Sequence, residues 1–216
     1  HVRLRLAVPF LLVPAPADTG LVFRRTDLDG FELEAKANNV ARVSYATSLM
    51  KKGVLISPTE HVLASLYSSG IDNVYIELDN LEVPILDGSA EPFMRLLEQA
   101  GVERLRKRRR YLKILKPVEV AEGDRRLGIF PANEFRVTCF IEFTHPLIGR
   151  QELEMVVNRG TFGTFLASAR TFGFTEDVTR LRAMGLIRGG SLENAIVLTP
   201  DGTMNGTLRY PDEFCR

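Results

Sequence analysis

The sequence has little of what several protein classes require. Its 216 residues include only two cysteines, Cys139 and Cys215, which lie far apart and form no C-x-x-C pair. This argues against a disulfide-stabilised scaffold and favours a reducing cytoplasm. The longest apolar run, residues 7–13, is interrupted by Pro9 and is far shorter than the ~20 residues of a membrane-spanning helix. It also lacks the small-residue cleavage site of a secretory signal peptide, so we expect a cytoplasmic protein.

An excess of charge of one sign is also missing. The formal net charge is +1, with 45% apolar and 25% charged residues, as in an ordinary globular protein. Residues 104–110 are the local exception, with six basic residues in seven. Because Tyr111 is the only aromatic residue beside this run, we predict a solvated linker and no nucleic-acid partner. At most, the linker would make peripheral contact with an anionic membrane surface.

Hydrophobic periodicity divides the chain into two similar halves. Expected strands are residues 2–6, 21–23, 74–78, 83–86, 111–115, 135–143, 153–157 and 195–198, and expected helices are residues 57–69, 91–100, 161–170 and 175–184. Strands that cluster before helices favour an α+β fold over a doubly wound sheet. We therefore predict two domains, residues 1–108 and 109–216, each a small mixed β-sheet packed on two helices.

Residues 57–61 (S-P-T-E-H) carry the first candidate site. They place Glu60 beside His61, one of only three histidines, at the expected start of a helix. This pairing suits a metal site in which one residue binds the ion and its neighbour handles the proton. The same residues fit a capping box, with Ser57 at the N-cap, Pro58 at N1 and Glu60 at N3. The residues alone leave both interpretations open.

Taken with three other segments, this motif resembles one enzyme family. The segments are residues 70–73 (G-I-D-N), 84–89 (P-I-L-D-G-S) and 169–174 (A-R-T-F-G-F). The resemblance, which covers about residues 15–216, is to the zinc-dependent UDP-3-O-acyl-N-acetylglucosamine deacetylases of lipid A synthesis. It implies a fold in which the helices of the two domains are sandwiched between the sheets. It also implies zinc as cofactor and an acylated UDP-sugar as substrate.

The resemblance assigns roles to particular residues. Glu60 would be the general base, His61 a zinc ligand, Thr171 the donor to the oxyanion and Phe172 a residue near the substrate. Four further residues would line the acyl-chain passage: Asp177, Val178, Ile187 and Gly190. By contrast, we interpret residues 84–89 as structural. His145, which precedes a proline, is expected to be a turn residue and not a ligand.

Two departures from the family pattern suggest truncation at both ends. The family's opening glycine-rich turn is missing, and residues 7–13 do not fit what should follow it. The family's other two zinc ligands, a histidine and an aspartate, come just after the segment that matches residues 212–216. A single His61 cannot hold zinc usefully, so we expect little or no activity from the chain as given.

The alternative is a non-catalytic protein that binds a nucleotide sugar or a partner. We expect a monomer in either case. The preferred acyl-chain length does not follow from the sequence.

Overall fold

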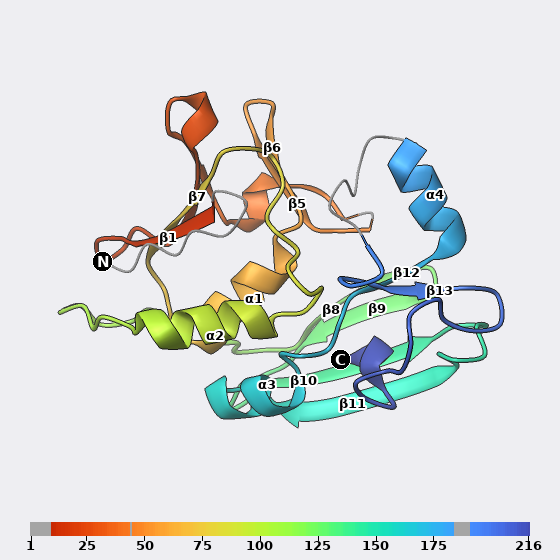
Figure 1. Cartoon of the computed structure of the whole chain (residues 1–216). Helices are drawn as coiled ribbons and strands as arrows, with labels where there is room; N and C mark the ends of the chain where they lie inside the picture. Colours follow the sequence, from red (N-terminus) through yellow and green to blue (C-terminus); the bar gives the residue numbers. More distant parts are fainter. Residues whose placement is uncertain (1–9, 44, 184–190) are drawn as a thin grey trace.

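The first half of the molecule contains a four-stranded sheet, which lies above α1 and α2 in Figure 1. The computed structural model describes residues 10–43, 45–183 and 191–216. The strand order is β1-β7-β2-β3, from β1 (Phe10–Pro14), β2 (Leu21–Arg25), β3 (Phe31–Glu34) and β7 (Val74–Leu78). Strand β7 runs antiparallel to β1 and parallel to β2, and β3 runs antiparallel to β2. In β7 the side chains of Val74, Ile76 and Leu78 are buried, as its alternating sequence predicts.

Two helices, α1 (Glu60–Ser68) and α2 (Glu91–Ala100), share one core with this sheet. Leu66 of α1 and Phe93 of α2 are fully buried there, and the rings of Phe10 and Phe93 pack edge to face. Phe10 lies in β1, so the described part of the unexplained segment 7–13 belongs to the sheet. Burying such large side chains is the main source of stability for this half.

A second, three-stranded antiparallel sheet leads into α1. Its strands are β4 (Val40–Arg42), β5 (Ser48–Lys51) and β6 (Val54–Ile56), and short 3₁₀ turns at Thr26–Leu28 and Ala37–Asn39 lie between the earlier strands. Leu49 and Ile56 anchor this sheet in the same core. The last residue of β6 is followed directly by the S-P-T-E-H segment, so the small sheet positions the start of α1.

The second half consists of two antiparallel hairpins and a βαβ unit. The hairpins are β8 (Val118–Glu122) with β9 (Arg125–Ile129), and β10 (Arg136–Glu142) with β11 (Arg150–Val156). Helix α3 (Arg159–Phe165) follows β11. Strands β12 (Phe172–Phe174) and β13 (Ile196–Leu198) pair in parallel, with α4 (Thr175–Ala183) in the connection between them. A 3₁₀ turn at Glu213–Cys215 lies near the end of the chain.

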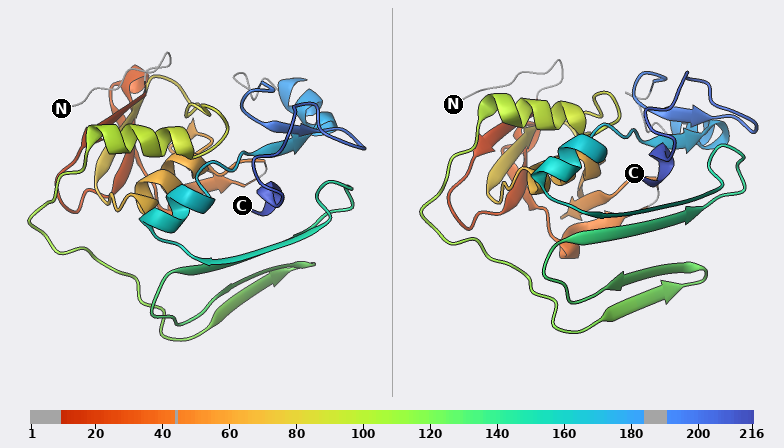
Figure 2. Two further views of the ribbon diagram at one scale, coloured as in Figure 1. Left: turned by 60° about the horizontal axis from the view of Figure 1, so that its bottom comes forward. Right: turned by 90° about the horizontal axis from the view of Figure 1, so that it is seen from below.

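The helices meet between the sheets of the two halves. One buried cluster joins them: it consists of Ala90 and Met94 at α2, Phe162 of α3, and Ala167. Ala64 of α1 packs against this cluster. Figure 2 shows α1, α2 and α3 between the four-stranded sheet of the first half and the two long hairpins of the second half, β8 with β9 and β10 with β11. The prediction of an α+β fold with helices sandwiched between sheets is confirmed.

Several expected elements differ in the structure. Residues 83–86 form no strand; the pairing there is a single bridge between Ser57 and Glu82, Pro84 has no N–H to donate, and Leu86 has a φ of 54°. Residues 111–115 form no strand either, and the side chain of Leu112 is 91% exposed. The helices expected at residues 57–69 and 161–170 are shorter. The strand expected at residues 2–6 lies outside the described residues.

The connection between α2 and β8, residues 101–117, contains no helix or strand. The division into residues 1–108 and 109–216 remains a prediction. Within the described residues, no helix has the length and apolarity needed to cross a membrane.

Candidate active site

Glu60 is the first residue of α1, and its carboxylate does not cap the helix. The N-cap residue is Thr59, whose hydroxyl instead donates to the carbonyl oxygen of Thr47 over 3.0 Å. The Glu60 carboxylate accepts a hydrogen bond from the backbone N–H of Thr47. Ser57 cannot begin the helix, because its backbone N–H and carbonyl pair with Leu81 and Val83 in an extended conformation. The capping-box interpretation is therefore wrong, and Glu60 remains the candidate base.

His61 follows on the first turn of α1, with its side chain partly buried. Burial is the largest influence on its imidazole and lowers the pKa below the ordinary value of 6.5. The carboxylates of Glu60 and Asp87 act in the opposite direction without reversing the shift. The ring therefore carries no charge at neutral pH, which is the form that ligates metals. No hydrogen bond to the His61 ring occurs among the described residues.

Thr171 is held by its backbone at the point where the two halves meet. Its N–H donates to the carbonyl oxygen of Gly88 over 2.8 Å, and its carbonyl accepts from the N–H of Ile196 over 2.9 Å. Within the part of the chain that the structure describes, the Thr171 hydroxyl has no hydrogen-bond partner. The hydroxyl is thus available to a ligand while the backbone beneath it is fixed.

Phe172 opens β12 and is part of an aromatic cluster. Its ring packs edge to face on Phe214 at 5.1 Å and on Phe143 at 6.0 Å between centroids. Phe174 packs against the same core, as expected for a structural residue. The Phe172 ring therefore forms a rigid apolar wall.

One large cavity collects the candidate residues of both halves. Its volume is about 2140 Å³, larger than the ~300–1,000 Å³ of a typical small-molecule pocket. Six predicted site residues line it: Glu60, His61, Thr171, Phe172, Asp177 and Val178. The other two predicted residues, Ile187 and Gly190, lie outside the described residues. Residues from distant parts of the sequence thus face one space that can accept a long ligand.

Asp177 is already engaged in the structure. Its carboxylate accepts from the hydroxyl of Tyr45 over 3.1 Å and from the guanidinium of Arg180 over 2.7 Å. The same guanidinium lies over the Tyr45 ring at 5.5 Å. Sequence reasoning missed Tyr45, since no local pattern brings it into contact with α4, 132 positions further along the chain.

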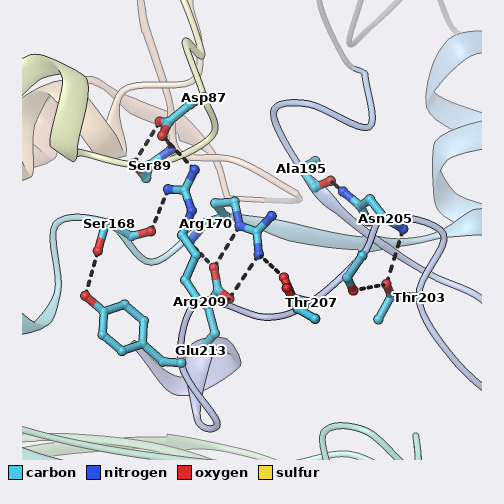
Figure 3. Close-up of polar contacts among 12 residues, drawn as sticks. Asp87, Ser89, Ser168, Arg170, Ala195, Thr203, Asn205, Thr207, Arg209 and Glu213 are labelled. Atoms are coloured by element: carbon cyan, nitrogen blue, oxygen red, sulfur yellow. Dashed lines mark hydrogen bonds and ion pairs between the residues drawn. The ribbon is translucent and has the colours of Figure 1, made fainter.

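A polar junction surrounds Arg170, the residue that precedes Thr171 in the chain (Figure 3). Glu213, 1% exposed, pairs with Arg170, and Arg209 pairs with Asp87 of the first half over 3.0 Å. Sequence reasoning missed the pairing of Arg170 with Glu213. No local signal marks it, because residues 212–216 (D-E-F-C-R) contain three charged side chains and Arg170 lies 43 positions earlier.

The described residues do not form a complete metal site. Among them, no three histidine, cysteine, aspartate or glutamate side chains are close enough to bind one ion, whereas a catalytic zinc takes three protein ligands. His145 is occupied elsewhere, as predicted for a turn residue: Nδ1 accepts from the N–H of Leu147 and Nε2 donates to the carbonyl oxygen of Thr199 over 2.6 Å. His61 alone does not fit a zinc ion.

Comparison with known proteins identifies the family. The family described as "LpxC: UDP-3-O-acyl N-acetylglycosamine deacetylase" matches residues 6–216. The UDP-3-O-acyl-N-acetylglucosamine deacetylase of Solibacter usitatus is 54% identical over 97% of this chain and 71% of its own length. The protein of the same name from Myxococcus xanthus is 45% identical over 97% of this chain and 67% of its own length. The chain therefore belongs to the UDP-3-O-acyl-N-acetylglycosamine deacetylase family.

Proposed function

We propose that this protein hydrolyses the N-acetyl amide of UDP-3-O-acyl-N-acetylglucosamine, releasing acetate and a free amine in the synthesis of lipid A. The observation that carries the proposal is the shared cavity, which brings Glu60 and His61 of α1 to the same space as Thr171. These residues come from motifs that resemble the family, and the chain is a member of it.

Glu60 is proposed as the general base. An amide is a poor electrophile, so the attacking water must lose its proton as it adds to the carbonyl carbon. Glu60 lines the cavity from the first turn of α1, and its carboxylate accepts a hydrogen bond from the Thr47 N–H, which fixes the side chain there. A carboxylate held at this place can take the proton from a water molecule in the cavity.

Thr171 is proposed as the donor to the oxygen that becomes negative in the tetrahedral intermediate. Thr171 lines the cavity, and its backbone is held on both sides. A donor fixed in this way need not reorganise as charge develops, which is worth about 3 kcal/mol per oxyanion donor.

Zinc is the metal we propose, with His61 as one of its ligands. When bound in such sites, zinc lowers the pKa of water and polarises a carbonyl. The described residues do not complete the coordination of a zinc ion. The roles proposed for Glu60 and Thr171 therefore rest on the contacts of these two residues alone. Because the coordination is incomplete, we propose that the chain as given has little or no activity.

The acyl chain of the substrate is proposed to lie along the apolar wall of the cavity. Phe172 and Val178 line that wall, with Asp177 beside them. By the resemblance to the family, Ile187 and Gly190 would also contact the acyl chain. Apolar burial at roughly 25 cal/mol per Å² would hold the chain there. We propose a monomer in the cytoplasm, with at most peripheral membrane contact through the basic linker.

A second candidate is a protein that binds the acylated UDP-sugar without hydrolysing it. The observation that favours it is the lack of a three-ligand metal group among the described residues. Such a protein would use the cavity as it stands and would be indifferent to metal chelators.

The first experiment compares the chain with a completed version of it. The 216 residues are assayed alone and joined to the part of the Solibacter usitatus relative that follows its match to this chain. Free amine is measured by mass spectrometry, bound zinc by elemental analysis and substrate affinity by calorimetry. We expect hydrolysis and zinc only in the completed version.

Three variants assign the roles within the completed version. Glu60→Gln and Thr171→Val should each lower turnover by at least ~100-fold, whereas the exposed control Glu103→Gln should not. Substrate binding without hydrolysis in either version, unchanged by a chelator, would favour the second candidate. If neither version binds or hydrolyses the substrate, both candidate functions are overturned.

A further inference from the structure

Glu213 has a buried carboxylate, and each of its two oxygens accepts two hydrogen bonds. Oε1 accepts from the backbone N–H of Arg170 over 3.0 Å and from Nε of the same residue over 2.9 Å. Oε2 accepts from Nη2 of Arg170 over 3.2 Å and from the backbone N–H of Arg209 over 2.5 Å. The Glu213 side chain is 0% exposed and that of Arg170 is 12% exposed. Four donors thus converge on one carboxylate that water does not reach.

This arrangement makes the position of Arg170 strongly determined. Burial by itself would raise the pKa of the Glu213 carboxyl, but the hydrogen bonds from Arg170 and from the two backbone N–H groups outweigh it, and the pKa is lowered. The carboxylate therefore stays charged at neutral pH. A buried charge that loses its partner is strongly destabilised, so Arg170 cannot move away from Glu213 without a large cost.

The segment held by Glu213 carries Thr171. Arg170 is its direct neighbour, and both its side chain and its backbone N–H are bound by the same carboxylate. The Arg209 backbone, also bound by Glu213, carries a side chain that pairs with Asp87 and donates to the carbonyl oxygen of Ser168 over 2.8 Å. Figure 3 shows these contacts converging around Glu213 from the 87–89 loop, the 168–170 segment and residues 207–213.

We infer that Glu213 is a positioning residue for Thr171: it acts through Arg170 and Arg209 to fix the Thr171 hydroxyl relative to the half of the molecule that carries Glu60. The inference rests on the proposed function for the role of Thr171, whereas the positioning itself is a property of the fold. Glu213 also lines the cavity, but the described hydrogen bonds of its carboxylate go to Arg170 and Arg209, so it acts through these residues and is not assigned a catalytic role.

The test replaces Glu213 by Gln, which keeps the shape but removes the charge and one acceptor. In the 216-residue chain, we expect the γ-methyl NMR signal of Thr171 to shift and its amide hydrogen exchange to accelerate at least tenfold. The amide of Ile76, in the core of the first half, should be unchanged. The matched control is Glu103→Gln, which changes an exposed glutamate. A Thr171 signal and exchange rate equal to those of the control would overturn the inference.

The kinetic arm uses the completed version described above. Glu213→Gln should lower kcat at least tenfold and leave KM within about twofold, because a misplaced oxyanion donor weakens only the transition state. If the parent enzyme shows no turnover, the proposed function fails while the NMR result still decides the positioning. If Glu213→Gln does not fold, Arg170→Lys keeps the backbone contact and the charge but loses the forked pair, and the same two readouts apply.

Discussion

The backbone N–H of Thr171 donates to the carbonyl oxygen of Gly88 over 2.8 Å, and this bond joins the two halves of the molecule at the candidate site. Gly88 lies in the loop between β7 and α2, whereas Thr171 precedes β12. The glycine has a φ of 82°, and a side chain built on it would overlap the carbonyl oxygen of Asn194. Only glycine allows the first half to approach the second so closely here.

Gly88→Ala is predicted to destabilise the protein by more than about 3 kcal/mol. The left-handed backbone costs about 1–2 kcal/mol for any residue with a Cβ, and overlap with a backbone atom cannot be relieved by a side-chain rotation. Urea unfolding followed by circular dichroism measures the change.

The control is Gly53→Ala, at a φ of 81° with open space around the added carbon. Its free energy of unfolding should fall by only about 1–2 kcal/mol, the conformational cost of the left-handed backbone. Equal losses in the two variants would contradict the argument that the contact with Asn194 matters.

Elements whose cause is local were predictable from the sequence. Strand β7 and helix α2 occupy residues 74–78 and 91–100, as expected from alternating and helical spacing of apolar residues. Gly101 ends α2 with a φ of 72°, in a region of backbone conformation that glycine adopts far more readily than other residues.

Features set by distant contacts were not predictable. The start of α1 was misplaced because pairing of Ser57 with Leu81 and Val83 is not visible in the local pattern. The strand expected at residues 111–115 has the right alternation but pairs with no described strand. The hydrogen bond of Tyr45 to Asp177 joins residues 132 positions apart. Pattern reasoning proposes which residues carry the chemistry, but it does not show which contacts hold them.

Cys215 is predicted to be nearly inert toward alkylation in the folded protein. The pKa of the Cys215 thiol is raised to about 12, mainly by burial and further by the nearby Cys139. Since the thiolate is the reacting form, at pH 8 Cys215 should react on the order of a thousandfold more slowly than a free thiol with a pKa of ~8.5.

Iodoacetamide labelling at pH 8, mapped by mass spectrometry, measures that rate. In urea the two cysteines should be labelled at similar rates, which provides the internal control. Rapid labelling of Cys215 in the folded protein would contradict its burial against the middle of β10, where its thiol donates to the Cys139 carbonyl.

The basic linker is predicted not to bind RNA at physiological salt. Lys107 and Arg110 both pair with Asp18, and Arg109 pairs with Asp72 over 2.6 Å, so half of its six cations face carboxylates. Fluorescence anisotropy with single-stranded RNA should show no binding tighter than ~10⁻⁴ M, the weak end of non-specific affinity.

A variant tests this reasoning. Asp18→Asn together with Asp72→Asn frees three cations without adding any, so it should bind RNA more tightly at low salt. RNA affinity that is equal in the two proteins would show that the ion pairs do not decide the outcome.

His61 is predicted to titrate below its ordinary value and to make stability depend on pH. Burial lowers its pKa in the folded state, whereas the unfolded chain retains a value near 6.5. Between the folded and unfolded values the unfolded state binds more protons, so the free energy of unfolding falls as the pH decreases through that window. The contribution is complete above pH 6.5 and is lost below the folded pKa.

Urea unfolding at several values between pH 7 and pH 5, for the parent chain and for His61→Gln, isolates this contribution. The parent should lose stability over that interval more steeply than the variant, because a glutamine does not titrate. NMR titration of the imidazole measures the folded pKa directly. Parallel pH profiles, or an imidazole that titrates at 6.5 or above, would mean that the ring is not held neutral by burial. At pH values below that pKa the ring would then have to lose a proton before it could bind a metal.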